Sequence, residues 1–359
     1  MFAAIDLGTL GGAHADAAAI NNAGRVVGWS ETSAGETRAF MWANGRMTDL
    51  GTLNGATSRA VAINDADDVV GHLETDTGFR GFFWSQGVMI DLGDLGGTLT
   101  SVTALNNRGH IAGASTTGDG EFHAFVWASG VMTDLGTLGA VPSSALAIND
   151  DDQIVGYSAT VDNDFSTLRA FRWANGVMTD LGTLGGSFSA ANDINRSGQI
   201  VGNSTLASGD NHGFVWNDGI MTDLGTLGGS ASFAEAINNA GQIVGVSTTG
   251  NGEQHAFLWA NGVMKDLGAP PSDVTPISAA IAINDAGVVL GHAFLPNSED
   301  HPFVWIRGMM IDLGTLTREP GSEAFPEAIN NVGQIVGGSN PGRAVLWQRA
   351  PRTSAGPQP

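Results

Sequence analysis

The chain contains no cysteine, one lysine and few charged residues overall. The absence of cysteine excludes disulfide bonds, thiolate metal ligands and a cysteine nucleophile. Positive side chains are almost all arginine, with Lys265 as the single lysine. The formal charge of −21 opposes binding to a phosphate backbone, because such binding requires a concentrated basic surface. We therefore expect no nucleic acid partner.

Long apolar runs are also absent. No segment approaches the 18 apolar residues of a membrane helix, so we expect no membrane insertion. The first eight residues have no basic region and no separate apolar core, so they do not read as a signal peptide. No nucleophile elbow, zinc-ligand spacing or phosphate-binding loop occurs either, and we expect neither a metal nor a cofactor.

The chain does contain one sequence repeat, here called the cassette, in eight copies. It reads A-I-N-x-x-G-x-V-V-G, then a variable stretch, then A-F-x-W-x-N-G-x-M-T-D-L-G-T-L-G-G. The first block occupies residues 19–28, 62–71, 104–113, 147–156, 193–202, 236–245, 282–291 and 328–337. The aspartate of the last block recurs at Asp6, Asp49, Asp91, Asp134, Asp180, Asp223, Asp266 and Asp312. A period in the low forties, made of short strands and tight turns, is typical of a propeller blade.

Each cassette holds four apolar runs of strand length, separated by Asn-x-x-Gly and Asn-Gly turns. Asp67 and Asp152 replace the turn glycine in copies two and four, and Asp is among the residues that tolerate a positive φ. The sequence therefore predicts an all-β, eight-bladed β-propeller of four-stranded antiparallel blades. The chain opens on a fourth strand at residues 6–10 and closes on a third strand at 344–347, so we expect the N-terminal strand to complete the last blade.

The predicted organisation is a single propeller domain over residues 1–347, followed by a polar, proline-rich tail over 348–359 that we expect to be disordered. We expect a monomer.

The repeat resembles the HAF family of extracellular repeats, named for His-Ala-Phe. That triplet stands at residues 123–125 and 255–257, with near-copies at 212–214 and 301–303, and the match covers nearly all of residues 3–347. The resemblance implies a secreted or surface protein and carries no activity with it. Since no signal peptide is recognisable, a cytoplasmic location stays open.

A cationic residue stands two positions before the aromatic position of every cassette: Arg38, Arg80, His123, Arg169, His212, His255, His301 and Arg343. Pairing the hairpin outward from its Asn-Gly turn sets Phe40 opposite Asp49 and places Arg38 diagonal to that aspartate. A ring of ligand-binding cations and a set of ion pairs within the blades both fit this pattern. We interpret the ring as architectural, because it repeats in every blade and buried charges must be paired.

Departures from the repeat suggest where function lies. The second-to-third strand loop and the loop between blades share one rim and vary in length, and binding residues often lie on such loops. Our main hypothesis is a non-enzymatic module that presents this rim to a protein or glycan. Its candidate ligand-binding residues are Asp162, Asp164, Phe165, Glu299, Asp300, Arg318 and Glu319.

The alternative is an enzyme, a hydrolase, lyase or cyclase, with its site at the mouth of the central channel. The first strand of each blade should line that channel with small residues. Its polar exceptions are the candidates for a cation site or for acid–base chemistry: Asp16, Arg59, Asp193, Glu235 and Glu327. A hydrated channel wall explains them equally well, and no catalytic residue is assigned.

Overall fold

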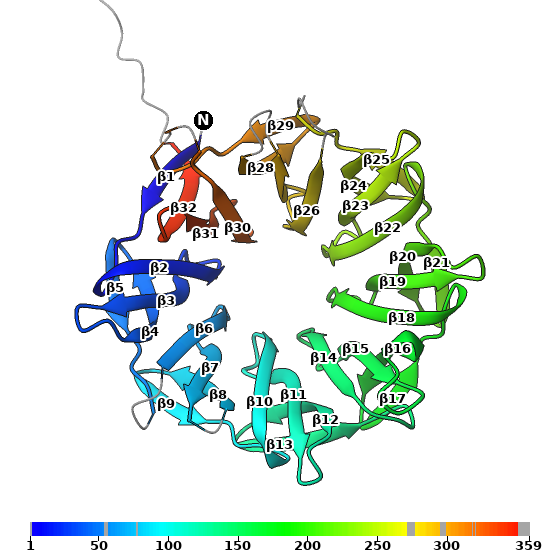
Figure 1. The fold of residues 1–359 in the computed structure, drawn as a ribbon, viewed down its shortest axis with the longest axis horizontal. Helices are drawn as coiled ribbons and strands as arrows, with labels where there is room; N and C mark the ends of the chain where they lie inside the picture. The colour runs from blue at the N-terminus through cyan, green and yellow to red at the C-terminus, as the bar shows by residue number, and fades with distance from the viewer. Residues whose placement is uncertain are drawn as a thin grey trace, which may run out of the picture.

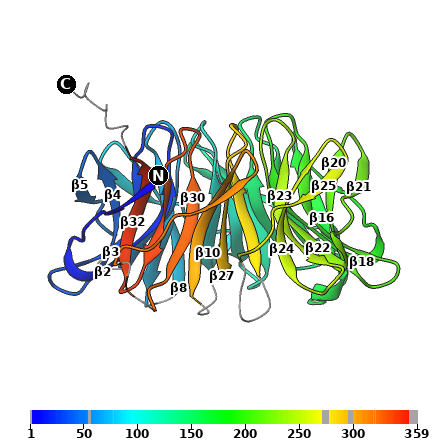
Figure 2. The same cartoon turned by 90° about the horizontal axis from the view of Figure 1, so that it is seen from above.

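The computed structural model describes residues 2–53, 57–76, 78–270, 277–294, 299–317, 319 and 321–350. They form eight four-stranded antiparallel sheets, arranged as blades around a central axis (Figure 1). Seen edge-on, the ring is a disc whose strands run between two rims (Figure 2). The predicted eight-bladed propeller is confirmed. No helix in the described part of the chain has the length and apolarity that crossing a bilayer would require.

Blades 1 to 4 each use four consecutive strands. They are β2 (Gly11–Ile20), β3 (Val26–Thr32), β4 (Thr37–Ala43) and β5 (Arg46–Asp49); β6 (Thr57–Ile63), β7 (Val69–Thr75), β8 (Gly78–Ser85) and β9 (Val88–Asp91); β10 (Gly96–Leu105), β11 (Ile111–Thr117), β12 (Phe122–Ala128) and β13 (Val131–Gly136); and β14 (Ser143–Ile148), β15 (Ile154–Ala159), β16 (Leu168–Ala174) and β17 (Val177–Asp180). One 3₁₀ turn, η1 (Phe165–Thr167), precedes β16.

Blades 5 to 8 repeat the pattern. They are β18 (Gly185–Ile194), β19 (Ile200–Leu206), β20 (Asn211–Asn217) and β21 (Ile220–Asp223); β22 (Gly228–Ile237), β23 (Ile243–Thr249), β24 (Gln254–Ala260) and β25 (Val263–Asp266); β26 (Ser278–Ile283), β27 (Val289–Phe294), β28 (Asp300–Ile306) and β29 (Met309–Asp312); and β30 (Ala324–Ile329), β31 (Ile335–Ser339) and β32 (Arg343–Arg349), completed by β1 (Phe2–Asp6).

The last blade is closed by the N-terminal strand, as predicted, but this strand occupies Phe2–Asp6 rather than residues 6–10. Strand β1 pairs antiparallel with β32, from Phe2 opposite Arg349 to Asp6 opposite Val345, and Figure 1 shows the two strands side by side. Strand β32 runs to Arg349, two residues beyond the predicted domain boundary, because Gln348 and Arg349 pair with β1. Residues 351–359 of the predicted tail lie outside the described residues.

The turns carry the predicted backbone conformations. Asp67 and Asp152, which replace glycine in copies two and four, have φ of 68° and 60°. Asn44, in the first Asn-Gly hairpin, has φ of 53°. These values place the residues in the left-handed region, where Asn and Asp are the best tolerated side chains after glycine. The positive φ required at these positions therefore explains why aspartate replaces the turn glycine in copies two and four.

The glycine that ends each A-I-N-x-x-G-x-V-V-G block faces a β-bulge in the first strand. In blade 5 the register between β18 and β19 shifts between Ala191 and Asp193. A Cβ on Gly202 would lie 2.0 Å from the carbonyl oxygen of Ala190. The bulge thus brings the backbone of β18 so close to β19 that only glycine, which has no Cβ, fits at position 202.

The core lies between blades rather than within them. Between blades 4 and 5, for example, Val155 and Ala170 pack against Ala191, Ile200 and Phe214, all of which are fully buried. The phenylalanine of the cassette is buried in blades 1 to 7, with exposed fractions of 0–2 %. Because every blade covers its neighbour, closure of the ring buries all eight contact faces.

The cationic ring forms ion pairs in most blades. Six pairs join the third strand to the fourth: Arg80–Asp91, His123–Asp134, His212–Asp223, His255–Asp266, His301–Asp312 and Arg343–Asp6, at 2.9–3.7 Å. The predicted register, with Phe40 opposite Asp49, is confirmed. In blade 1, however, the ion-pair partner of Arg38 among the described residues is Glu36, at 2.9 Å, rather than Asp49. In blade 4 the Nε of Arg169 is buried and has no hydrogen-bond partner among the described residues.

We expect the His301–Asp312 pair to stabilise the fold only within a pH window. The hydrogen bond to Asp312 raises the pKa of His301. Burial acts to raise the pKa of Asp312, but the His301 and Gly314 contacts outweigh it and hold that pKa low. The contribution is therefore lost as pH rises through the raised histidine pKa, and also as pH falls through the lowered aspartate pKa.

Thermal unfolding of His301→Gln and of the unaltered protein tests this window. The gap in unfolding free energy should be about 1 kcal/mol or less near pH ~5.5, because the pair is partly exposed, and should shrink by pH ~8.5. A gap that widens with rising pH would contradict the assignment.

Candidate functional site

A polar ring closes around the axis at the rim formed by the short turns. The asparagine of each A-I-N block is only 3–6 % exposed. Its Nδ2 donates to the carbonyl oxygen of the corresponding asparagine in the next blade, at 2.9–3.2 Å, in all eight blades. The final bond runs from Asn330 to Asn21 and joins the last blade to the first. These eight residues form the inner asparagine ring: Asn21, Asn64, Asn106, Asn149, Asn195, Asn238, Asn284 and Asn330.

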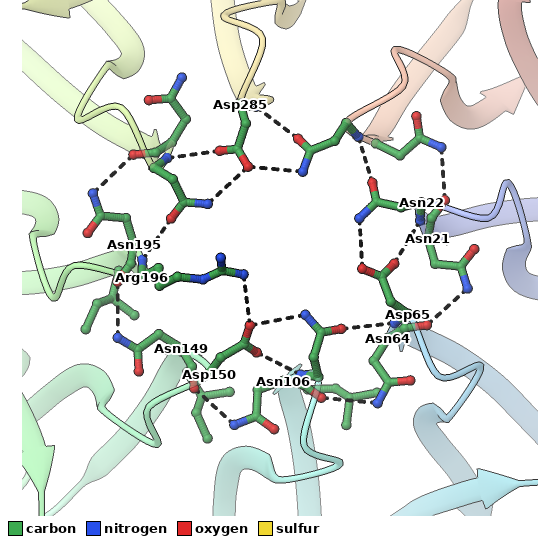
Figure 3. Close-up of a pocket in the computed structure, with 18 of the residues that line it drawn as sticks. Asn21, Asn22, Asn64, Asp65, Asn106, Asn149, Asp150, Asn195, Arg196 and Asp285 are labelled. Atoms are coloured by element: carbon green, nitrogen blue, oxygen red, sulfur yellow. Dashed lines mark hydrogen bonds and ion pairs between the residues drawn. The ribbon is translucent and has the colours of Figure 1, made fainter.

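A second ring uses the residue that follows each of these asparagines (Figure 3). In seven steps its backbone N–H donates to a side-chain oxygen of the next blade, at 2.9–3.0 Å. The eighth step, from Asp150 to Arg196, lacks this bond because an arginine side chain has no acceptor. The Arg196 guanidinium instead reaches back to Asp150 at 3.5 Å. The outer ring consists of Asn22, Asp65, Asn107, Asp150, Arg196, Asn239, Asp285 and Asn331.

Together the two rings line a cavity of about 400 Å³ at the mouth of the channel. Their side chains largely satisfy one another: Asp65, for example, accepts from both the backbone N–H and the side-chain amide of Asn22. A wall of mutually bonded amides and carboxylates is polar and rigid. The mouth therefore favours the passage or capture of polar groups.

Three charged side chains stand on the first strands of three successive blades, which are the innermost strands of the ring (Figure 1). Glu327 lies on β30, Asp16 on β2 and Arg59 on β6. The Oδ1 of Asp16 is buried without a hydrogen-bond partner among the described residues. It lies above Gly338, where an added Cβ would come within 2.7 Å of it. The Arg59 guanidinium stacks on the Trp29 ring, 4.3 Å from its centroid.

Both carboxyls of this cluster have a raised pKa. Burial raises the pKa of Asp16, against the opposing effects of the Ala17 N–H and the Arg59 charge. Burial also raises the pKa of Glu327, and the neighbouring Asp16 carboxylate raises it further. The Asp16 carboxylate therefore disfavours ionisation of Glu327.

The other predicted channel residues have different surroundings. Asp193 is directed between blades 5 and 6 rather than into the channel. Its carboxylate accepts hydrogen bonds from the backbone N–H groups of Ile194 in blade 5 and Ile237 in blade 6, at 2.8 and 2.9 Å. It sits at the position that holds alanine in the other copies, and that position faces the neighbouring blade. Glu235 lies on β22, and partial burial of its carboxyl raises its pKa with no acidic neighbour contributing.

The predicted rim residues do not come together. Asp164 accepts from Ser166 and caps η1, beside Asp162, which accepts from Val141 N–H. The neighbouring Phe165 is 62 % exposed. These residues belong to blade 4, whereas Glu299 and Asp300 belong to blade 7, elsewhere on the ring (Figure 1).

In blade 7 the acidic residues have structural partners. Asp300 is buried and lies 3.1 Å from His292, and Glu299 lies 3.6 Å from His301. Glu319 is exposed, and Arg318 lies outside the described residues. Within the described ranges, no three His, Asp or Glu side chains group so as to hold a metal ion.

The inner asparagine ring is the feature that sequence reasoning missed. The asparagine of A-I-N occurs in all eight copies, and we interpreted it as a turn residue only. A turn alone tolerates Asp, Ser or Gly at that position. Its retention without exception was the available signal for a contact that crosses between blades.

No protein-family model matches this chain, and no curated protein matches it. Solved structures do. A prolyl endopeptidase has a TM-score of 0.59 at 9 % identity, over 91 % of this chain and 54 % of its own. Dipeptidyl peptidase 4 from Porphyromonas gingivalis has a TM-score of 0.55 at 8 % identity, over 87 % and 55 %. At these identities the likeness shows the fold, and this chain spans little more than half of either peptidase.

The β-propeller domain of the Trilobed protease from Pyrococcus furiosus matches over its full length and 86 % of this chain, with a TM-score of 0.54 at 10 % identity. That domain has an open velcro topology, whereas here β1 closes the last blade. These likenesses correct our main functional hypothesis. The propellers named above are parts of peptidases, which contradicts the hypothesis of a non-enzymatic module that presents variable loops to a protein or glycan.

Proposed function

We propose that this protein is a hydrolase that acts on peptides, with Asp16 and Glu327 in the central channel as its acid–base pair. The observation that carries the proposal is the placement of two carboxyls on the first strands of adjacent blades, where the Asp16 charge acts on Glu327 and each carboxyl has a raised pKa. One of their oxygens is buried and has no partner among the described residues. Two carboxyls that share a proton supply a general acid and a general base in one site.

The surroundings of the two carboxyls favour different roles for them. Asp16 receives the Ala17 N–H and faces the positive charge of Arg59, and both favour its ionised form. Glu327 experiences burial and the Asp16 charge, and both favour its protonated form. Asp16 therefore takes a proton from the attacking water, and the water oxygen bonds to the peptide carbonyl carbon. Glu327 gives its proton to the leaving nitrogen as the C–N bond breaks, and Arg59 stabilises the negative charge on the carbonyl oxygen.

The comparisons support the substrate class. Prolyl endopeptidase, dipeptidyl peptidase 4 and the Trilobed protease are all named for peptide hydrolysis, and each contains a propeller similar to this one. The polar mouth of about 400 Å³ supports it as well, because a peptide backbone presents donors and acceptors along its length.

Hydrolysis of a mixed library of fluorogenic peptides tests the proposal. Glu327→Gln and Asp16→Asn should each lower kcat by about 100-fold or more, the usual contribution of general acid–base catalysis. Glu235→Gln is the matched control. Glu235 occupies the same bulge position in blade 6 as Glu327 in blade 8, and its pKa is also raised, but the next blade has Ala279 where the neighbour of Glu327 has Asp16.

The proposal fails if the unaltered protein cleaves no peptide in the library. It also fails if Glu327→Gln cleaves as fast as Glu235→Gln.

The pH dependence of kcat gives an independent check. Activity requires ionised Asp16 and protonated Glu327, so the profile should be bell-shaped. Since both pKa values are raised, its acidic and basic limbs should lie above the ordinary carboxyl range. Glu327→Gln should remove the basic limb from the residual activity, and a basic limb that survives in this variant would assign it to another group.

A further inference from the structure

A second cavity, of about 280 Å³, lies between blades 2 and 3. Phe79 and Phe122 are 53 % and 39 % exposed, which is unusual for phenylalanine in a propeller that buries the cassette aromatics. The remaining lining residues are His72, Leu99, Thr100 and Ser101. None of the six carries a fixed charge, although the chain has a net charge of −21. We call this cavity the blade 2–3 pocket.

His72 gives the pocket one oriented polar group. Its Nε2 accepts a hydrogen bond from the Val102 backbone N–H at 2.9 Å, so this nitrogen carries no proton. Burial lowers the pKa of His72, which disfavours the charged imidazolium. The proton of the neutral ring must then reside on Nδ1, which becomes a hydrogen-bond donor.

The pocket lies on the opposite side of blade 2 from the Arg59 guanidinium. Arg59 stacks on Trp29 of blade 1, whereas its β7 partner His72 accepts from the Val102 N–H of blade 3. Ser101, at the edge of the pocket, occupies the same position in blade 3 as Arg59 in blade 2 and Asp16 in blade 1. Asp16, the Arg59 cation and the pocket therefore lie at three successive interfaces between blades.

We propose that the blade 2–3 pocket binds a bulky apolar side chain of a peptide, and that a backbone carbonyl oxygen of that peptide accepts a hydrogen bond from the Nδ1–H of His72. The choice of a peptide rests on the proposed function. Two exposed aromatic rings and Leu99 offer apolar contact area, and 280 Å³ suits a single large side chain rather than a folded partner. The uncharged lining disfavours lysine, arginine and acidic side chains, because their charges would lose water without gaining a partner.

Binding of blocked amino acids tests the pocket without requiring turnover. By NMR titration, N-acetyl-phenylalaninamide should bind at least roughly tenfold more tightly than N-acetyl-glycinamide, because it buries a large side chain. The double variant Phe79→Ala/Phe122→Ala should abolish this preference. The control Phe165→Ala removes a phenylalanine that is 62 % exposed in blade 4 and should leave the preference unchanged. Glu327→Gln should also leave it unchanged.

Equal binding of the two probes, or a preference that survives the double variant, would overturn this inference whether or not peptides are cleaved. Selective binding in a protein that cleaves no peptide would instead remove the proposed hydrolase activity and leave the pocket as a peptide-binding site. Cleavage that shows no preference for a large apolar residue would reject the pocket alone.

Discussion

A chain that begins at Leu7, without β1, is expected to unfold roughly 5–10 °C below the full-length protein. Strand β1 completes the last blade through five residue pairs with β32. It also contributes to two cores, since Ile5 packs against the cluster between blades 8 and 1, and Phe2 and Ala4 against the cluster between blades 7 and 8. Losing their burial costs roughly 3–5 kcal/mol.

The truncated protein should also self-associate, because β32 becomes an exposed edge strand. Differential scanning calorimetry and size-exclusion chromatography measure both effects. Ala3→Ser in the full-length chain is the control: Ala3 is not among the residues packed in these two clusters, so the melting temperature should stay within about 1 °C. A truncated chain that is monomeric and has an unchanged melting temperature would show that β1 does not close the ring.

Gly202→Ala should destabilise the protein by at least about 3 kcal/mol. The added Cβ would lie 2.0 Å from the Ala190 carbonyl oxygen and 2.8 Å from the Ala191 Cα. Both are backbone atoms of the adjacent strand, so no side-chain rotation relieves the overlap. The bulge in β18 would have to shift, and with it the contact between blades 4 and 5.

Gly219→Ala in the same blade is the matched control. Gly219 has φ of 90° but no atom within 4 Å of an added Cβ, so alanine there meets backbone strain and no overlap. We expect a cost of about 1 kcal/mol, measured by denaturant unfolding of both variants. Equal costs for the two substitutions would mean that close approach is not the reason for glycine at position 202.

The two functional hypotheses rested on different sequence signals, loop irregularity for the rim and polar residues in the first strand for the channel. Loop irregularity directed attention to Phe165, Glu299 and Asp300, but the ring places blade 4 apart from blade 7 and gives Asp300 a histidine partner. The channel carboxyls were identified as an alternative from their place in the first strand. Their proximity across blades 8 and 1 was not visible, because Asp16 and Glu327 stand at opposite ends of the chain.

The sequence by itself determined the number of blades, the four strands in each, the hairpin register and the closure of the ring. These follow from local patterns, namely the alternation of apolar residues, the turn residues and the repeat length, which act over a few residues and recur eight times. Only the tertiary structure decided which residues meet across blades. The bond from Asn330 to Asn21 and the effect of the Asp16 charge on Glu327 depend on closure of the ring, and the bond from Ile237 to Asp193 depends on the packing of blade 5 on blade 6. Such contacts join side chains on different repeats, and no local pattern encodes the angle at which one blade packs on the next.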